Sequence, residues 1–138
     1  MARDLFHELV REALEADGWI ITHDPFVLKS GGLRLEVDLA AEQMLAAELG
    51  HEKIVVEIKS FIGKSKLNDF YEAKGQYDVY RRGLKKEGVQ RKLYLAVDVD
   101  VYETFFQKSL IAELLEDELI SLLVYDIPMK RIVQWITR

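Results

Sequence analysis

Hydrophobic positions recur at helical spacing near the start of the chain and again in its second half. In residues 2–16 the apolar side chains fall on one stripe surrounded by charged side chains, which predicts an amphipathic helix that ends near Gly18. Residues 66–87 are predicted to form a second helix. A third, amphipathic helix is expected to follow the segment 92–101 and to run to about residue 116.

Strand patterns account for most of the remaining chain. Between residues 33 and 39, leucine and valine alternate with charged residues, which is the period of a β-strand with one polar face. The glycines at 31–32 are expected to form a turn, and no element is predicted for residues 43–51. The other predicted strands cover residues 19–28 with a break at Asp24-Pro25, 54–59, 92–101, 120–125 and 132–136, the last two as a pair around Pro128.

These elements follow the order α-β-β-β-α-β-α-β-β, which predicts an α/β fold with a mixed central β-sheet flanked by helices. The chain has 138 residues, 49% hydrophobic and 31% charged, so it can bury a core and is expected to form a single domain over residues 1–138. Because cysteine is absent, disulfides, cysteine-bound zinc and thiol nucleophiles are excluded. No segment resembles a signal peptide or a membrane span, so a cytoplasmic protein without membrane contact is expected.

The net charge of −5 hides an uneven distribution along the chain. Residues 53–92 hold 11 basic and 5 acidic side chains, a net charge of +6, whereas residues 1–52 carry −7 and residues 93–138 carry −4. The total charge argues against tight, non-specific binding of nucleic acid. The positive charge of residues 53–92 is still compatible with a local DNA contact.

The predicted strand at 54–59 carries the most informative chemistry. Glu57 and Lys59 are two residues apart, so they lie on the same face of this strand. Their apolar neighbours imply that both faces are covered, and a buried charge is costly unless it is paired or bound to a metal. A structural Glu–Lys pair and a site for a cation and a substrate oxygen both fit this pattern.

Asp38 is the candidate partner of Glu57. If the segment 33–39 pairs antiparallel with the strand at 54–59, an offset or a bulge would bring Asp38 opposite Glu57. Two carboxylates, a main-chain carbonyl and waters would suit Mg²⁺, and Lys59 beside them could orient the attacking water and stabilise phosphate charge. The alternative is a solvated aspartate at the end of a strand.

The predicted helix at 66–87 offers further candidates. Gln76 and Tyr80 are four residues apart and share one helix face, with the glutamine expected to face inward. An ordinary solvated helix with a packed tyrosine is the alternative. The cations that could contact a phosphodiester backbone are Lys64, Lys66, Arg81, Arg82 and Lys85.

The predicted first helix holds one more candidate ligand. Glu8 could supply a further carboxylate to the metal, although its position on the polar side favours an exposed helix residue. The three histidines, His7, His23 and His51, show no spacing that is typical of metal ligands. Phosphate-binding glycine loops and a nucleophilic-serine motif are also absent from the sequence.

Taken together, Glu8, Asp38, Glu57-Ile58-Lys59 and Gln76-x-x-x-Tyr80 resemble the motifs of the PD-(D/E)xK superfamily, which has the restriction-endonuclease-like fold. The resemblance spans about residues 1–101, and Val37 stands where the superfamily pattern has proline. It implies phosphodiester hydrolysis that depends on Mg²⁺ or Mn²⁺. Asp38 and Glu57, with Glu8 as a further carboxylate, would then be metal ligands and Lys59 would lie near the attacking water.

Several short segments are also similar to the XisH family, the fdxN element excision controlling factors of cyanobacteria. The similar segments are residues 3–12, 35–42, 56–61 and 132–136, which together reach over nearly the whole chain. This resemblance implies a role in programmed DNA excision during heterocyst differentiation. A separate site-specific recombinase would cut and rejoin the DNA, and an XisI-type protein would be a partner.

Three functions are compatible with these features. The first is a metal-dependent endodeoxyribonuclease that uses Asp38, Glu57 and Lys59 on DNA. The second is a non-cleaving accessory protein that keeps the nuclease fold and regulates a recombinase through DNA or protein contacts. The third is an antitoxin-like or purely structural partner domain. Its acidic ends and its late apolar segments, 119–125 and 132–136, would form a subunit interface, for example in a homodimer.

Overall fold

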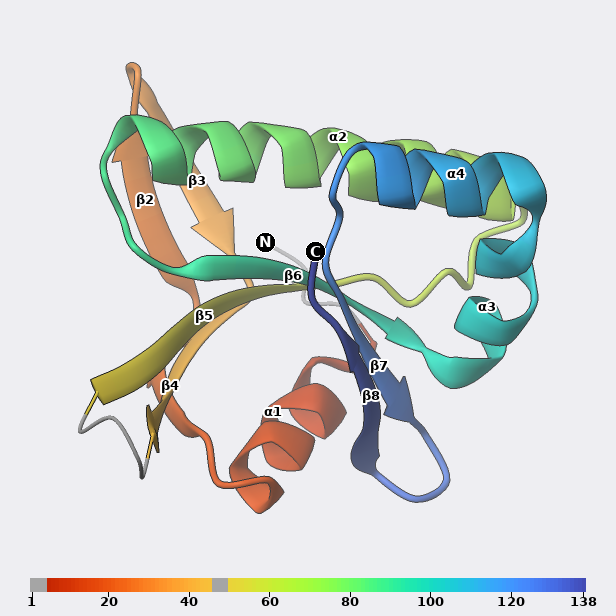
Figure 1. Ribbon diagram of the computed structural model, residues 1–138, viewed down its shortest axis with the longest axis horizontal. Helices are drawn as coiled ribbons and strands as arrows, with labels where there is room; N and C mark the ends of the chain where they lie inside the picture. The colour runs from red at the N-terminus through yellow and green to blue at the C-terminus, as the bar shows by residue number, and fades with distance from the viewer. Residues whose placement is uncertain (1–4, 46–49) are drawn as a thin grey trace.

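A mixed β-sheet forms the centre of the computed structural model, which describes residues 5–45 and 50–138 (Figure 1). Its three central strands β5, β6 and β7 run parallel, while each outer strand pairs antiparallel with its neighbour. Among the described residues, the order across this sheet is β1 (Ile20–His23), β4 (Leu39–Leu45), β5 (Gly50–Ile58), β6 (Lys92–Asp98), β7 (Leu122–Asp126) and β8 (Arg131–Ile136). The predicted α/β class with a mixed central sheet is confirmed.

A separate antiparallel hairpin, β2 (Phe26–Ser30) and β3 (Leu33–Val37), extends beside the sheet. Its turn is made by Gly31 and Gly32, whose φ angles of 56° and 84° lie in the left-handed region that glycine adopts without strain. The hairpin packs against the second half of the longest helix, where Gly83 lets the side chains of Leu28 and Leu35 approach the helix backbone closely.

Helices cover both faces of the sheet (Figure 1). Helices α2 (Lys66–Lys86) and α4 (Ser109–Asp117) lie on one face, and α1 (His7–Ala16) lies on the other. Ser65 begins α2, because its hydroxyl accepts a hydrogen bond of 3.1 Å from the backbone N–H of Asn68. Among the described residues, no helix has both the length and the apolar character needed to cross a membrane.

Two hydrophobic clusters separate these layers, and strand alternation assigns residues to them. In β5, Val55 belongs to the cluster beneath α2 and α4, whereas Ile54 and Val56 belong to the cluster beneath α1. Both faces of this strand are therefore buried, as its run of β-branched residues predicts. Glu57 lies two positions after Val55 in β5 and therefore points toward the α2 side.

Three predicted elements differ in the structure. The segment 33–39 is not one strand, because the chain bends at Asp38 between β3 and β4. Residues 43–45 and 50–51, for which no element is predicted, belong to strands β4 and β5. The strand predicted at 92–101 ends at Asp98, and the helix after it is split into α3 (Val99–Glu103), a 3₁₀ turn (Phe105–Gln107) and α4. The split places two phenylalanines of the 3₁₀ turn against Phe61 and Phe70 in the core, so tertiary packing overrides local pattern here. Residues 2–4 of the predicted first helix lie outside the described residues.

Candidate functional site

Asp38 and Glu57 meet where β4 begins and β5 ends. The antiparallel register pairs Leu39 with Val56, so the position before Leu39 adjoins the position after Val56. Oδ2 of Asp38 accepts a hydrogen bond of 2.7 Å from the backbone N–H of Ile58, and the backbone N–H of Asp38 donates to Oε1 of Glu57 at 3.4 Å. The carboxylate of Asp38 thus accepts a hydrogen bond from β5, and the carboxylate of Glu57 accepts one from the backbone of Asp38. The bend at Asp38 gives the offset that brings the two side chains together.

The two carboxylates differ in their exposure to solvent. Glu57 is 7% exposed, while the side chain of Asp38 is 23% exposed. Tyr80 reaches toward them from α2: burial raises the pKa of its phenol, and the negative charges of Glu57, Asp38 and Glu36 raise this pKa further. Tyr80 therefore stays protonated at neutral pH and can act as a hydrogen-bond donor beside the carboxylate pair.

Lys59 lies on the same side of β5 as Glu57, as strand alternation predicts. Its ammonium forms an ion pair with the carboxylate of Glu72 on α2, with a distance of 2.6 Å between Nζ and Oε2. This partner lowers the pKa of Glu72, which is exposed at the rim of the site. The Lys59 ammonium is thus held by a carboxylate of α2.

Gln76 does not face inward, which makes this part of the sequence prediction wrong. Its side chain is exposed because the buried stripe of α2 passes through Ala73 and Tyr77. Gln76 nevertheless lies four residues from both Glu72 and Tyr80, so these three residues form one row along the helix. The row borders the side of the sheet that carries Glu57 and Lys59.

A second group of charged side chains approaches Asp38 from α1. His7 is buried, with 3% exposure, and its Nε2 lies 2.8 Å from Oδ1 of Asp24. Arg11 donates a hydrogen bond of 2.6 Å to the other oxygen of Asp24, which also raises the pKa of Arg11. Nδ1 of His7 lies 3.9 Å from Oδ1 of Asp38. The histidine therefore stands between the two aspartates.

Glu8, the carboxylate predicted as a further ligand, is exposed next to His7 on α1. Within the described part of the chain, Glu8, His7 and Asp24 are a group whose potential ligand atoms all lie within 4.8 Å of one another. Sequence reasoning missed His7 and Asp24, because Asp24 was interpreted only as a strand break. One signal was available: His7 lies three residues before Val10 and so falls on the buried stripe of the helix.

The predicted DNA-contacting cations do not form one continuous row. Lys64 and Lys66 lie at the start of α2, whereas Arg81, Arg82 and Lys85 lie in its second half. Arg81 donates hydrogen bonds of 2.8 Å and 3.0 Å to the carbonyl oxygens of Glu118 and Leu119 and stacks over Tyr77, so its guanidinium already has structural partners.

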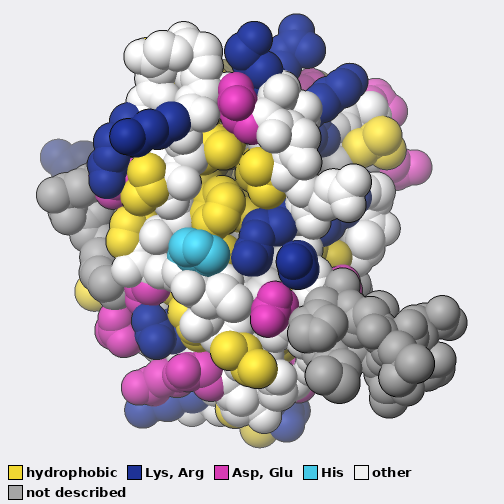
Figure 2. All heavy atoms as spheres, turned by 90° about the vertical axis from the view of Figure 1, so that its left-hand side faces the viewer, with side chains coloured by type: hydrophobic (Ala, Val, Ile, Leu, Met, Phe, Trp, Pro, Cys, Tyr) yellow, Lys and Arg dark blue, Asp and Glu magenta, His cyan; other side chains and the backbone are white. Residues whose placement is uncertain are grey.

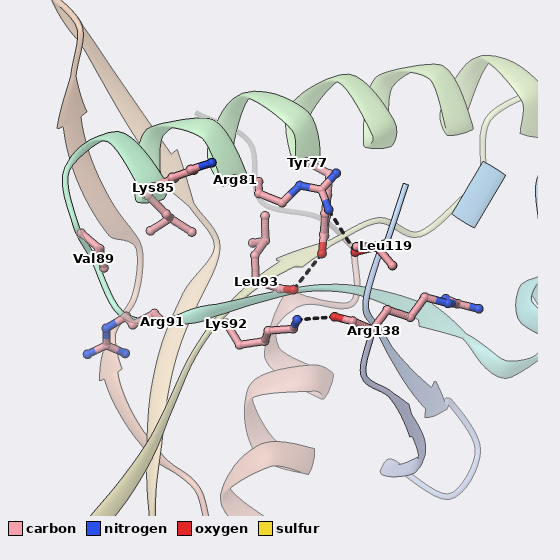
Figure 3. Close-up of a pocket in the computed structure, with 10 residues that line it drawn as sticks. Tyr77, Arg81, Lys85, Val89, Arg91, Lys92, Leu93, Leu119 and Arg138 are labelled. Atoms are coloured by element: carbon pink, nitrogen blue, oxygen red, sulfur yellow. Dashed lines mark hydrogen bonds between the residues drawn. The ribbon is translucent and has the colours of Figure 1, made fainter. Parts of the chain in front are cut away.

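A basic pocket lies at the other end of α2, where β6 begins. It has a volume of about 350 Å³, and Figure 3 shows Arg81 above it and Lys92 bonded to the backbone of Arg138 below. Its charged lining consists of Arg81, Lys85, Arg91, Lys92 and Arg138. On the face shown in Figure 2, basic side chains surround exposed hydrophobic ones, with acidic side chains among them. Neither Asp38 nor Glu57 lines this pocket, and the pair lies where β5 ends.

The donor set around Asp38 fits a divalent cation. Asp38 and Glu57 offer hard oxygen ligands and would hold such an ion. Nδ1 of the buried His7 lies 3.9 Å from Oδ1 of Asp38 and has no hydrogen-bond partner among the described residues. Glu8 lies on the outer side of this group, next to His7 on α1.

These features define a mixed α/β protein whose central sheet carries a pair of carboxylates, one of them buried, at the end of strand β5, with a lysine and a histidine nearby. The chain belongs to the XisH family, because the family model described as XisH protein matches residues 1–133. The family resemblance predicted from short segments is thereby confirmed.

Two solved structures are similar to nearly the whole chain. One is an XisH family protein from Nostoc punctiforme PCC 73102, with 41% identity and a TM-score of 0.88 over 97% of this chain and 100% of that one. The other is an fdxN element excision controlling factor protein from Anabaena variabilis, with 42% identity and a TM-score of 0.88 over 98% of this chain and 100% of that one. No curated protein matches the chain.

Proposed function

We propose that this protein controls the excision of a DNA element and that it does so through a PD-(D/E)xK-type site that hydrolyses DNA phosphodiester bonds with Mg²⁺ or Mn²⁺. The role in excision rests on the 42% identity to the fdxN element excision controlling factor protein. The chemistry rests on one observation above all, the convergence of Asp38 and Glu57 through reciprocal hydrogen bonds with Lys59 on the same side of the strand.

Each residue of the site has a distinct role in this proposal. Asp38 and Glu57 hold the cation, which would supply Lewis-acid chemistry at a phosphate oxygen. Lys59, released from Glu72 when DNA arrives, contacts the phosphate and stabilises its negative charge. Tyr80 remains protonated and donates a hydrogen bond within the site.

The surrounding charges suggest how DNA would lie on the protein. Gln76 is exposed on the row that borders the site and would contact the sugar–phosphate backbone. Lys64 and Lys66 flank the beginning of α2, on the side of the molecule where β5 ends. Since the chain carries a net charge of −5, these contacts are expected to be few and sensitive to salt.

Nicking of supercoiled and branched DNA tests the proposal. Purified protein is incubated with each substrate and Mg²⁺ or Mn²⁺, and the wild type should nick at least one of them. Lys59→Ala should abolish nicking, while Lys53→Ala, which removes an exposed lysine from the same strand, should not change it. No nicking by the wild type, or equal nicking by Lys59→Ala, would refute hydrolysis.

A second function, a non-cleaving accessory protein, is favoured by a different observation. Lys59 is paired with Glu72, and Arg81 is bound to backbone carbonyls, so neither cation is directed toward a substrate in this structure. In this case the protein would regulate a recombinase, with an XisI-type protein as its partner. Excision in cells should then survive Asp38→Asn and Glu57→Gln, and loss of excision by either folded variant would rule this function out.

A further inference from the structure

The two ring nitrogens of His7 have different surroundings. Nε2 is 2.8 Å from Oδ1 of Asp24, and the other oxygen of Asp24 accepts a hydrogen bond of 2.6 Å from Arg11. A carboxylate held by a guanidinium is ionised and can only accept. Nε2 therefore donates to Asp24, and the side chain of Asp24, with 9% exposure, holds the ring in one orientation.

The other ring nitrogen, Nδ1, is buried and faces a carboxylate oxygen. Nδ1 has no hydrogen-bond partner among the described residues, and the nearby oxygen, Oδ1 of Asp38, is an acceptor. The separation of 3.9 Å between these two atoms is too long for a hydrogen bond. Two ligand atoms of one cation, each about 2.0–2.2 Å from it, lie about 3–4 Å apart. The observed distance fits that spacing.

We infer that His7 is a nitrogen ligand, through Nδ1, of the cation held by Asp38 and Glu57, with Asp24 orienting the imidazole from behind. The inference rests on the metal site of the proposed function but not on DNA cleavage. A carboxylate bonded to the outer nitrogen of a metal-bound histidine is the arrangement that recurs in protein metal sites. Asp24 and Arg11 are positioning residues here, since they act on the cation only through His7.

The nitrogen ligand sets the metal preference of the site. Mg²⁺ prefers an octahedron of oxygen atoms, whereas first-row transition metals accept imidazole readily. With His7 among its ligands, the site should bind Mn²⁺ more tightly than Mg²⁺. Removing the imidazole should reduce this advantage and leave a weaker site made of oxygen ligands.

A competing position for the cation lies between His7, Glu8 and Asp24, whose potential ligand atoms are within 4.8 Å of one another. A cation there would have to displace Arg11 and Nε2 of His7 from the oxygens of Asp24. Both contacts are short and charge-assisted, so the position next to Asp38 is favoured.

Pulsed electron paramagnetic resonance of Mn²⁺ bound to the full chain tests the inference. The wild type should show a hyperfine coupling from a directly bound imidazole nitrogen. His7→Ala and His7→Gln should lose this coupling and weaken Mn²⁺ binding by about tenfold or more. His23→Ala, which removes an exposed histidine from β1, should keep both, and circular dichroism confirms that each variant is folded.

The other outcomes separate this inference from the proposed function. Mn²⁺ binding without nitrogen coupling in the wild type, or coupling that survives in folded His7 variants, overturns the role of His7 and leaves the carboxylate site standing. Coupling that is lost in Glu8→Gln but survives in Asp38→Asn moves the cation to the competing position and also overturns it. If the wild type shows nitrogen coupling but nicks no DNA, His7 is supported as a metal ligand and only the proposed hydrolysis is refuted.

Discussion

Tyr77 connects α2 to two strands of the sheet, and replacing it with phenylalanine should destabilise the protein measurably. Its phenol, with 2% exposure, donates to the carbonyl of Leu93 at 3.0 Å and accepts from the backbone N–H of Ser121 at 3.1 Å. These partners lie where β6 and β7 begin. Burial raises the pKa of Tyr77, so the hydroxyl keeps the proton that it donates.

Tyr77→Phe removes two buried hydrogen bonds and leaves a buried carbonyl and a buried N–H without this partner. A buried hydrogen bond contributes about 1 kcal/mol net, and a polar group left unsatisfied costs about 1–3 kcal/mol, so we expect a loss of about 2–3 kcal/mol. With a urea m-value of about 2 kcal/mol/M, the unfolding midpoint should fall by about 1 M. Fluorescence of the two tryptophans reports the transition.

Tyr71→Phe is the matched control, because Tyr71 lies on the same helix and is 60% exposed. Its unfolding free energy should stay within about 0.5 kcal/mol of the wild type. If Tyr77→Phe also stays within that range at an unchanged m-value, the two hydrogen bonds do not hold α2 to the sheet, and the reasoning is refuted.

Three further predictions concern the site and its surroundings. The raised pKa of Tyr80 favours the protonated phenol in the folded state. The contribution of this group to the unfolding free energy should therefore be complete below about pH 10 and be lost as pH rises above it. Between about pH 9 and about pH 11, the unfolding free energy measured in urea should decrease less for Tyr80→Phe than for the wild type. Glu72→Gln releases Lys59 and should speed nicking without changing Mn²⁺ affinity measured by titration; slower nicking would show that the ion pair positions Lys59. Arg81→Ala removes the hydrogen bonds to the carbonyl oxygens of Glu118 and Leu119, and calorimetry should find a Tm lower by about 3–5 °C.

Glu57 could be found from the sequence because it interrupts an otherwise apolar strand, and a buried charge needs a partner. Asp38 could be found because antiparallel strands bring distant positions together. The bend at Asp38 could not, since its side chain bonds to the backbone of Ile58, 20 residues away. Alternating apolar and charged residues run unbroken through the bend, so local pattern alone predicts one strand.

His7 and Asp24 escaped prediction for a similar reason. Their hydrogen bond joins residues 17 positions apart, and no spacing along the chain marks them as partners. The third helix was predicted as continuous because its pattern is amphipathic throughout. In the structure the two phenylalanines at 105–106 turn into the core against Phe70, and this packing breaks the helix. Long-range contacts decide both features.

The carboxylates of the site also hold the sheet together, and this determines which substitutions can reveal their chemistry. Oδ2 of Asp38 accepts a hydrogen bond from the backbone N–H of Ile58, and Oε1 of Glu57 accepts one from the backbone N–H of Asp38. Alanine at either position would remove a ligand and a junction between β4 and β5 at once, so a lost activity would have two explanations. Asp38→Asn and Glu57→Gln keep a carbonyl oxygen that can accept the same hydrogen bond while removing the charge that binds a cation. Only these variants separate the metal chemistry of the site from its structural role.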